Sequence, residues 1–90
     1  MPSGSAQRPS DVVRAMNGTY IEVENTDAEG RLTLADAVEY AKQNGAKQII
    51  DVATLTGAVI MALGHGLIGA FGNDSKLLDT LKESGEVTGE

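Results

Sequence analysis

The stretch YIEVENTDAEGRL, residues 20–32, joins two different patterns. Apolar and polar residues alternate up to Glu24, and Ile21 and Val23 share one face, which is typical of a strand with one buried side. The octapeptide Asn25–Leu32 that follows carries two acids, a glycine and an arginine. The sequence therefore predicts a strand that ends in a loop, and we expect the chemistry of the protein in this loop.

The two acids of the loop are candidate metal ligands. Asp27 and Glu29 lie two residues apart, so both carboxylates can turn into one small volume and hold a divalent cation. Arg31 cannot be a ligand, because its guanidinium stays protonated and has no lone pair to give; beside a metal it would orient or stabilise an anion. In an arbitrary protein, the same acids would more often form a solvated turn.

The residues around this loop predict a hairpin and a helix. Asn17-Gly18 is a hairpin turn signal, and Val12 and Val13 would lie in the first arm. After the loop, apolar residues recur at helical spacing. This pattern predicts a helix with Thr33 as its N-cap and Asn44-Gly45 at its end.

The second half of the chain continues the alternation of strands and helices. Apolar runs predict strands over residues 49–52 and 67–72, separated by a short helix over residues 58–63. A last helix would begin with Ser75 as its cap. This order predicts an α/β fold with helices covering a mostly buried sheet, although three or four strands are too few to complete one.

Composition limits what the protein can do alone. A chain of 90 residues buries only about 60–65% of its unfolded surface, so a self-sufficient enzyme is not expected. The net charge of −6 opposes binding to nucleic acid and to anionic lipid. The longest strongly apolar stretch is far shorter than the roughly 20 residues of a membrane span. The absence of cysteine excludes thiolate catalysis and fits a reducing compartment such as the cytoplasm.

The octapeptide resembles the signature of the cytosol, or leucyl, aminopeptidases, which reads Asn-Thr-Asp-Ala-Glu-Gly-Arg-Leu. The likeness extends to Met1–Gly4, to Ile50–Ala58 and to Ala62–His65, in the family's order and spacing. It implies that residues 1–90 are part of the C-terminal catalytic domain of a two-metal aminopeptidase. The implied fold is zinc-peptidase-like: part of a three-layer sandwich, with helices on both faces of a mostly buried mixed sheet.

The resemblance also implies roles for single residues. Asp27 and Glu29 fall on metal ligands, with Glu29 bridging two divalent cations, Mn²⁺ or Zn²⁺, and Arg31 falls on the catalytic arginine. The segment after the predicted strand falls on substrate-binding positions, which are Leu55, Thr56 and Gly57. From the sequence without the resemblance, this segment is more simply a strand-to-helix connection.

The activity implied by the resemblance is release of N-terminal amino acids, of the leucine type, from peptides. The cations would acidify a bound water, polarise the scissile carbonyl and bind the substrate's free α-amine. This amine must be neutral to bind and has a pKa of about 8, so we expect mildly alkaline activity. The family further implies a homo-oligomer, a hexamer, in the cytoplasm.

The family's remaining metal ligands have no counterpart here. A lysine and two further aspartates, with a second lysine that assists catalysis, come from a segment upstream of the octapeptide; residues 1–24 hold no such pattern, and the first lysine is Lys42. Two divalent cations bring a charge of +4, whereas two carboxylates supply −2. We therefore expect residues 1–90 alone to bind metal weakly and to be inactive. The only histidine, His65, is expected to be structural or solvent-facing.

Two other functions remain open. The first is calcium binding, because five residues fall at positions 1, 3, 5, 6 and 12 of an EF-hand-like loop: Asn25, Asp27, Glu29, Gly30 and Asp36. An EF-hand needs an entering helix, however, and a strand is predicted there. The second is a noncatalytic α/β interaction module that keeps the signature.

Overall fold

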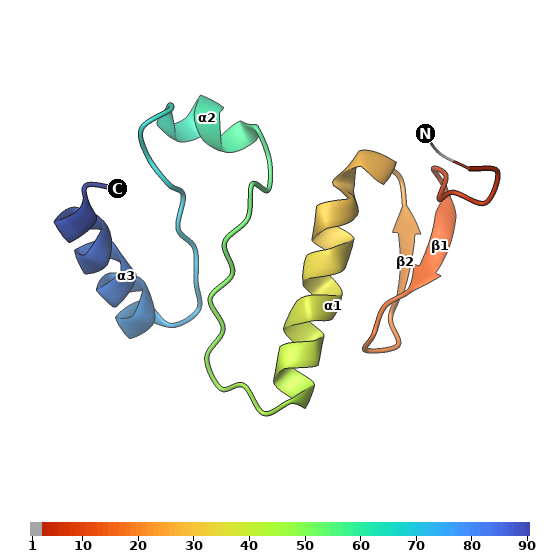
Figure 1. Ribbon diagram of the computed structural model, residues 1–90, viewed down its shortest axis with the longest axis horizontal. Helices are drawn as coiled ribbons and strands as arrows, with labels where there is room; N and C mark the ends of the chain where they lie inside the picture. Colours follow the sequence, from red (N-terminus) through yellow and green to blue (C-terminus); the bar gives the residue numbers. More distant parts are fainter. Residues whose placement is uncertain (1–2) are drawn as a thin grey trace. The chain divides into compact units, whose positions relative to one another are not determined.

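The computed structural model describes residues 3–90, and the chain divides into two compact units, residues 1–55 and residues 56–90. Each unit has its own helices, and strands occur only in the described part of the first (Figure 1). The first unit contains β1 (Asp11–Arg14), β2 (Tyr20–Val23), the 3₁₀ turn η1 (Thr26–Ala28) and α1 (Glu29–Gln43). The second contains α2 (Ala58–Leu63) and α3 (Ser75–Thr88).

The predicted hairpin is confirmed. β1 and β2 pair antiparallel, with Asp11 opposite Val23. At the other end, the Ala15 N–H donates to the Thr19 carbonyl at 2.7 Å and the Gly18 N–H donates to the Ala15 carbonyl at 2.9 Å. Gly18 has φ +89°, so this three-residue loop places its glycine in the left-handed conformation that such loops require.

A tight turn leads into β1. The Asp11 N–H donates to the Arg8 carbonyl at 3.1 Å, and Ser10 has φ 75° between them. Pro9 at the second position and a positive φ at the third are typical of a type II turn, where the third position favours glycine. The Ser10 N–H donates to the Val23 carbonyl at 2.7 Å, which holds this turn against the end of β2.

Helix α1 begins earlier than predicted. The side chain of Asn25 accepts a hydrogen bond from the Asp27 N–H at 3.0 Å and caps η1, and α1 follows directly from Glu29. The prediction of Thr33 as the N-cap is therefore wrong: Thr33 lies inside the helix, where its hydroxyl donates to the Glu29 carbonyl at 3.1 Å. The predicted end is confirmed, since Asn44 is the C-cap and the following glycine has φ +87°.

The second unit holds the two remaining helices. α2 has the predicted bounds, whereas the cap of α3 is Asp74 and not Ser75. Asp74 has the extended backbone of an N-cap, and its carboxylate accepts from the Leu77 N–H at 3.1 Å. Ser75 is already helical, so its hydroxyl is one position too late to cap the first turn.

The two strands predicted for the second half of the chain are wrong for this structure. Residues 49–52 and 67–72 have no regular secondary structure, and Figure 1 draws them as connecting segments. A strand needs a hydrogen-bonded neighbour, and β1 with β2 is the only pairing among residues 3–90. These segments are therefore exposed rather than buried, as the exposed fractions of Val52 (92%) and Phe71 (96%) show.

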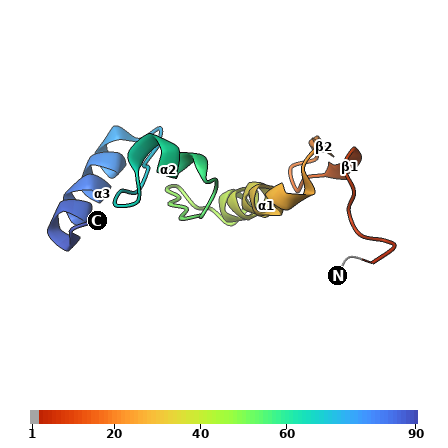
Figure 2. The ribbon, with the colours of Figure 1, turned by 90° about the horizontal axis from the view of Figure 1, so that it is seen from above.

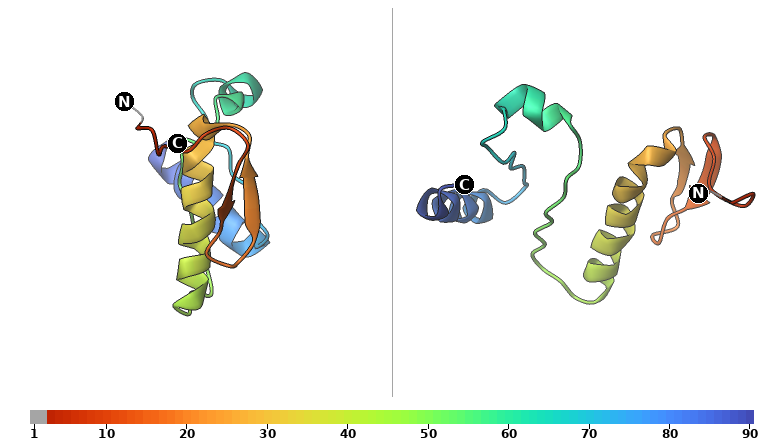
Figure 3. Two further views of the ribbon diagram at one scale, coloured as in Figure 1. Left: turned by 90° about the vertical axis from the view of Figure 1, so that its right-hand side faces the viewer. Right: turned by 45° about the horizontal axis from the view of Figure 1, so that its top comes forward.

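The hydrophobic core is small, because most of the large apolar residues are exposed. Val23 is the one buried hydrophobic residue among residues 3–90, at 4% exposed. Half-buried Ile21, Leu32, Leu34 and Val38 come from β2 and α1. Figures 2 and 3 show α1 alongside the hairpin, so the core of the first unit lies between these elements. Across residues 3–90, every helix is too short or too polar to cross a membrane.

Candidate functional site

The octapeptide forms the junction between β2 and α1. Asp27 lies in η1, Glu29 is the first residue of α1, and Arg31 follows in the first helical turn. All three residues are exposed, and their side chains make no hydrogen bond or ion pair with other residues in the range 3–90. The two acids sit where a helix favours negative charge, because the first N–H groups of a helix carry a partial positive charge.

The two carboxylates are suitable ligands for a divalent cation, but they are too few to complete a site for two cations. Aspartate and glutamate oxygens suit Mn²⁺ and can also bind Zn²⁺. Within residues 3–90, however, no group of three or more histidine, cysteine, aspartate or glutamate residues is placed to hold a metal ion. Asp27 and Glu29 can therefore form only part of a ligand set for two cations, and the remaining donors must come from other residues.

The structure contradicts the EF-hand alternative. Positions 5 to 12 of the proposed loop fall within α1, so these residues cannot wrap around an ion. The preceding element is strand β2, where an EF-hand has a helix. Asp36, the residue at position 12, lies more than one helical turn beyond Glu29, and its carboxylate accepts from the Met16 N–H at 2.9 Å.

The predicted substrate-binding positions lie just before α2. Leu55 is 56% exposed, and the hydroxyl of Thr56 accepts from the Ala58 N–H at 3.2 Å. Gly57 is the N-cap of α2 with φ −67°, a value that any residue adopts, and the space around it is open. An irregular segment, and not a strand, leads into this turn.

His65 is exposed, which agrees with the solvent-facing role expected for it. Sequence reasoning missed two polar contacts near the octapeptide. One is the Asn25 side chain as the cap of η1, which the Asn-Thr-Asp pattern could have indicated. The other is the contact between Asp36 and Met16, which joins residues 20 positions apart and leaves no local pattern in the sequence.

Comparison with known proteins assigns the family. The sequence profile of the cytosol aminopeptidase family, catalytic domain, matches residues 1–90. Proteins named "Probable cytosol aminopeptidase" are 57% identical in Chlorobium limicola, over 91 residues, and 54% identical in Aeropyrum pernix, also over 91 residues. Each alignment covers 100% of this chain and 18% of the relative.

A solved structure agrees with these sequence relatives. A mutant of tomato leucine aminopeptidase matches with a TM-score of 0.94 and 53% sequence identity, over 100% of this chain and 18% of that chain. The class defined by fold and signature is therefore an α/β peptidase domain. The chain belongs to the cytosol aminopeptidase family and lies in its catalytic domain. The resemblance seen at Asn25–Leu32 is confirmed at the level of the family, and the roles of single residues remain predictions.

Proposed function

We propose that residues 1–90 are part of the catalytic domain of a metal-dependent aminopeptidase that releases N-terminal amino acids, of the leucine type, from peptides in the cytoplasm. One observation carries this proposal: the family profile matches all 90 residues and the octapeptide Asn25–Leu32 is intact. The names of the relatives and of the solved structure support the reaction and the preference for leucine.

In this proposal, Asp27 and Glu29 hold two divalent cations, Mn²⁺ or Zn²⁺, together with donors from other residues. Both side chains are exposed and unpaired within residues 3–90, so binding a cation would break no existing contact there. When bound, the cations would supply Lewis-acid polarisation and a water of lowered pKa. Because the two carboxylates neutralise only half of the charge of +4, residues 1–90 alone would be inactive.

Arg31 would act on the substrate and not on the metal. Its guanidinium stays protonated at any working pH and follows the two acids in the first turn of α1. Attack of water on a peptide carbonyl places negative charge on the carbonyl oxygen, and a nearby fixed cation stabilises this charge. The same guanidinium could hold a small anion that serves as the proton shuttle.

The turn before α2 would bind the substrate. Exposed Leu55 offers an apolar contact, and open space around Gly57 allows a peptide to approach the main chain. The Thr56 hydroxyl already accepts from the Ala58 N–H, so its main-chain atoms are the better candidates for contacts with the substrate.

The proposal extends to the fold and assembly of the whole enzyme. The chain spans 18% of the length of the relatives it matches, and its apolar segments 49–52 and 67–72 are exposed. In the complete catalytic domain, these segments would join a buried mixed sheet covered by helices on both faces. The enzyme would form a homo-oligomer, a hexamer, with peptides as substrates and neither nucleic acid nor membrane as a partner.

A hybrid enzyme tests the function directly. In it, residues 1–90 replace the matching segment of tomato leucine aminopeptidase, which is 53% identical. We expect the hybrid enzyme to hydrolyse leucyl peptides with Mn²⁺, and Asp27→Asn or Glu29→Gln to lower kcat/KM by at least about a hundredfold, because each removes a charged ligand. Asp79→Asn, an exposed acid on α3, is the matched control.

Two outcomes would contradict the proposal. A folded, metal-loaded hybrid enzyme without hydrolysis would favour the noncatalytic interaction module. Full activity in the Asp27→Asn and Glu29→Gln variants would remove these residues from the site.

A further inference from the structure

One donor in the turn of the hairpin bonds to a residue outside the hairpin. Within the turn, the Gly18 N–H donates to the Ala15 carbonyl and the Thr19 N–H donates to the Asn17 side chain at 3.0 Å. The Met16 N–H instead donates to the carboxylate of Asp36 on α1, at 2.9 Å. Among residues 3–90, this is the one hydrogen bond that joins the hairpin to α1.

This bond lies where α1 runs back beside the hairpin. From Glu29, α1 runs back beside the hairpin, and the seven steps to Asp36 rise about 10 Å. At this point of the helix, the carboxylate of Asp36 reaches the Met16 N–H in the hairpin turn.

β2 and α1 are thus joined at both ends. The octapeptide Asn25–Leu32 connects them at one end, and the bond between Asp36 and Met16 connects them at the other. Because η1 continues directly into α1, a movement of α1 relative to the hairpin would carry Asp27 and Glu29 with it and change where both carboxylates lie relative to the hairpin. The bond at the far end restrains this movement.

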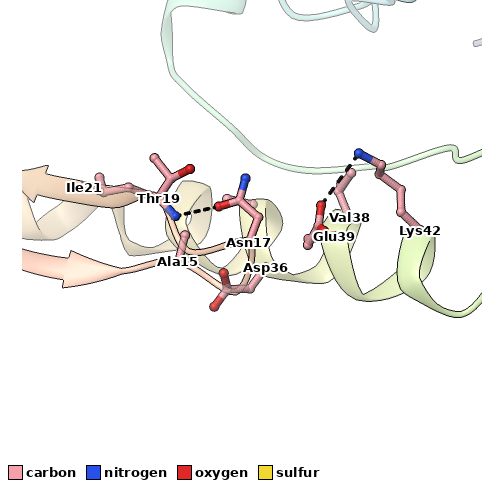
Figure 4. A pocket seen from close by; sticks show the side chains of 9 residues that line it. Ala15, Asn17, Thr19, Ile21, Asp36, Val38, Glu39 and Lys42 are labelled. Atoms are coloured by element: carbon pink, nitrogen blue, oxygen red, sulfur yellow. Dashed lines mark hydrogen bonds and ion pairs between the residues drawn. The ribbon is translucent and has the colours of Figure 1, made fainter.

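At the turn, side-chain packing does not restrain α1 against the hairpin as this bond does. An open pocket of about 200 Å³ lies beside this bond, lined by Thr19 and Ile21 on the hairpin and Val38 and Glu39 on the helix (Figure 4). The buried core residue, Val23, lies at the octapeptide end. A hydrogen bond to an ionised carboxylate is short, directional and roughly twice as strong as a neutral one. At the turn end, this bond is the main directional contact.

We propose that Asp36 is a positioning residue of the aminopeptidase site. It touches neither substrate nor metal; by accepting from the Met16 N–H it fixes α1 against the hairpin and so holds the helical segment that carries Asp27 and Glu29 in place relative to the rest of the site. This inference rests on the proposed function, because it assumes that these two carboxylates share a metal site.

The test deletes the bond from each side in the hybrid enzyme. Asp36→Ala removes the acceptor, and Met16→Pro removes the donor at the second position of a tight turn, where proline is favoured. Asp36→Asn keeps an oxygen that can accept the same bond, and Asp79→Ala is the control. The readouts are the dissociation constant for Mn²⁺, from electron paramagnetic resonance titration, and the separate values of kcat and KM.

We expect Asp36→Ala and Met16→Pro each to weaken Mn²⁺ binding by about tenfold, the scale known for outer contacts of metal sites. The double variant should lose about as much as either single variant, because both delete one bond. Asp36→Asn should stay within about threefold of the wild type, and saturating Mn²⁺ should restore kcat.

Unchanged Mn²⁺ affinity in Asp36→Ala, additive losses in the double variant, or an equal loss in Asp36→Asn would each overturn the inference. Failure of the proposed function looks different. In that case the unsubstituted hybrid enzyme does not hydrolyse leucyl peptides, whatever Asp36 does to Mn²⁺ affinity. If Asp36→Ala does not fold, the comparison of Met16→Pro with Asp36→Asn decides the inference.

Discussion

At the scale of a single residue, the substitution of Arg31 by lysine keeps the positive charge but changes the shape of the group that carries it. Its guanidinium is a planar fork that can bind two oxygens at once, whereas the ammonium of lysine is a compact point charge. In the hybrid enzyme, Arg31→Lys should lower kcat by about a hundredfold, the typical effect of losing one contact to a developing oxyanion. The Mn²⁺ affinity should not change, because Arg31 is not a ligand. Steady-state kinetics and metal titration measure the two effects separately.

A loss of Mn²⁺ affinity equal to the loss of kcat would contradict this role. It would mean that Arg31 holds the metal site together and does not act on the substrate. Arg14→Lys, on β1, is the control for the exchange of arginine for lysine elsewhere in the first unit.

Ser10 offers a test of backbone strain. Its φ of 75° lies in the left-handed region, which disfavours any residue with a Cβ. Ser10→Gly should therefore raise the free energy of unfolding by about 0.5–1 kcal/mol, since the relief of strain exceeds the added entropy of the unfolded chain. Denaturation with urea measures the change. Ser10→Ala keeps the strain and should bring no gain; a gain there would show that the serine side chain, and not φ, matters.

Helix α3 gives a prediction at the scale of an element, because sequence and structure disagree about its cap. The carboxylate of Asp74 accepts from the Leu77 N–H, so Asp74→Ala should lower the free energy of unfolding of the second unit by about 1 kcal/mol. Ser75→Ala should have a smaller effect, or stabilise slightly, because alanine has the higher helix propensity. Circular dichroism during denaturation compares them, and a larger loss in Ser75→Ala would restore serine as the cap.

Elements held by local contacts were predictable from the sequence. The hairpin depends on Asn17-Gly18, and the end of α1 depends on a glycine with positive φ. The start of α1 was misplaced because Asn25 caps a 3₁₀ turn that the helix then continues, so the octapeptide is folded and not a loop. The apolar runs at 49–52 and 67–72 were predicted as strands from composition, but a strand depends on a neighbour that no local pattern names.

The same difference between local and long-range contacts applies to the candidate site. Asp27, Glu29 and Arg31 are candidates because they belong to a local signature, and the comparisons confirm the family of that signature, while the roles of the three residues stay predictions. The contact between Asp36 and Met16 was not predictable, since it joins residues 20 positions apart and requires α1 to lie beside the hairpin. The sequence thus identifies the residues proposed for the chemistry more readily than those proposed to position them.

At the scale of the whole molecule, the apolar surface is the dominant feature. Val52 and Phe71 are 92% and 96% exposed, in runs that the sequence composition would place inside a protein. Exposed apolar surface of this kind promotes association. The 90-residue chain should therefore self-associate as its concentration rises, and replacing Val52 and Phe71 by serine should reduce the association. Sedimentation velocity measures both.

The substitution of Val52 by serine also tests whether residues 49–52 are buried or exposed in the complete enzyme. If residues 49–52 form a buried strand in the complete domain, Val52→Ser should lower the stability of the hybrid enzyme by about 2 kcal/mol, because it removes buried methyl groups and adds a hydroxyl that needs a partner. In the isolated chain, Val52 is already in solvent and the same change should leave unfolding unaffected. Equal effects in both proteins would mean that this segment stays exposed in the enzyme, and the proposed three-layer sandwich would be wrong.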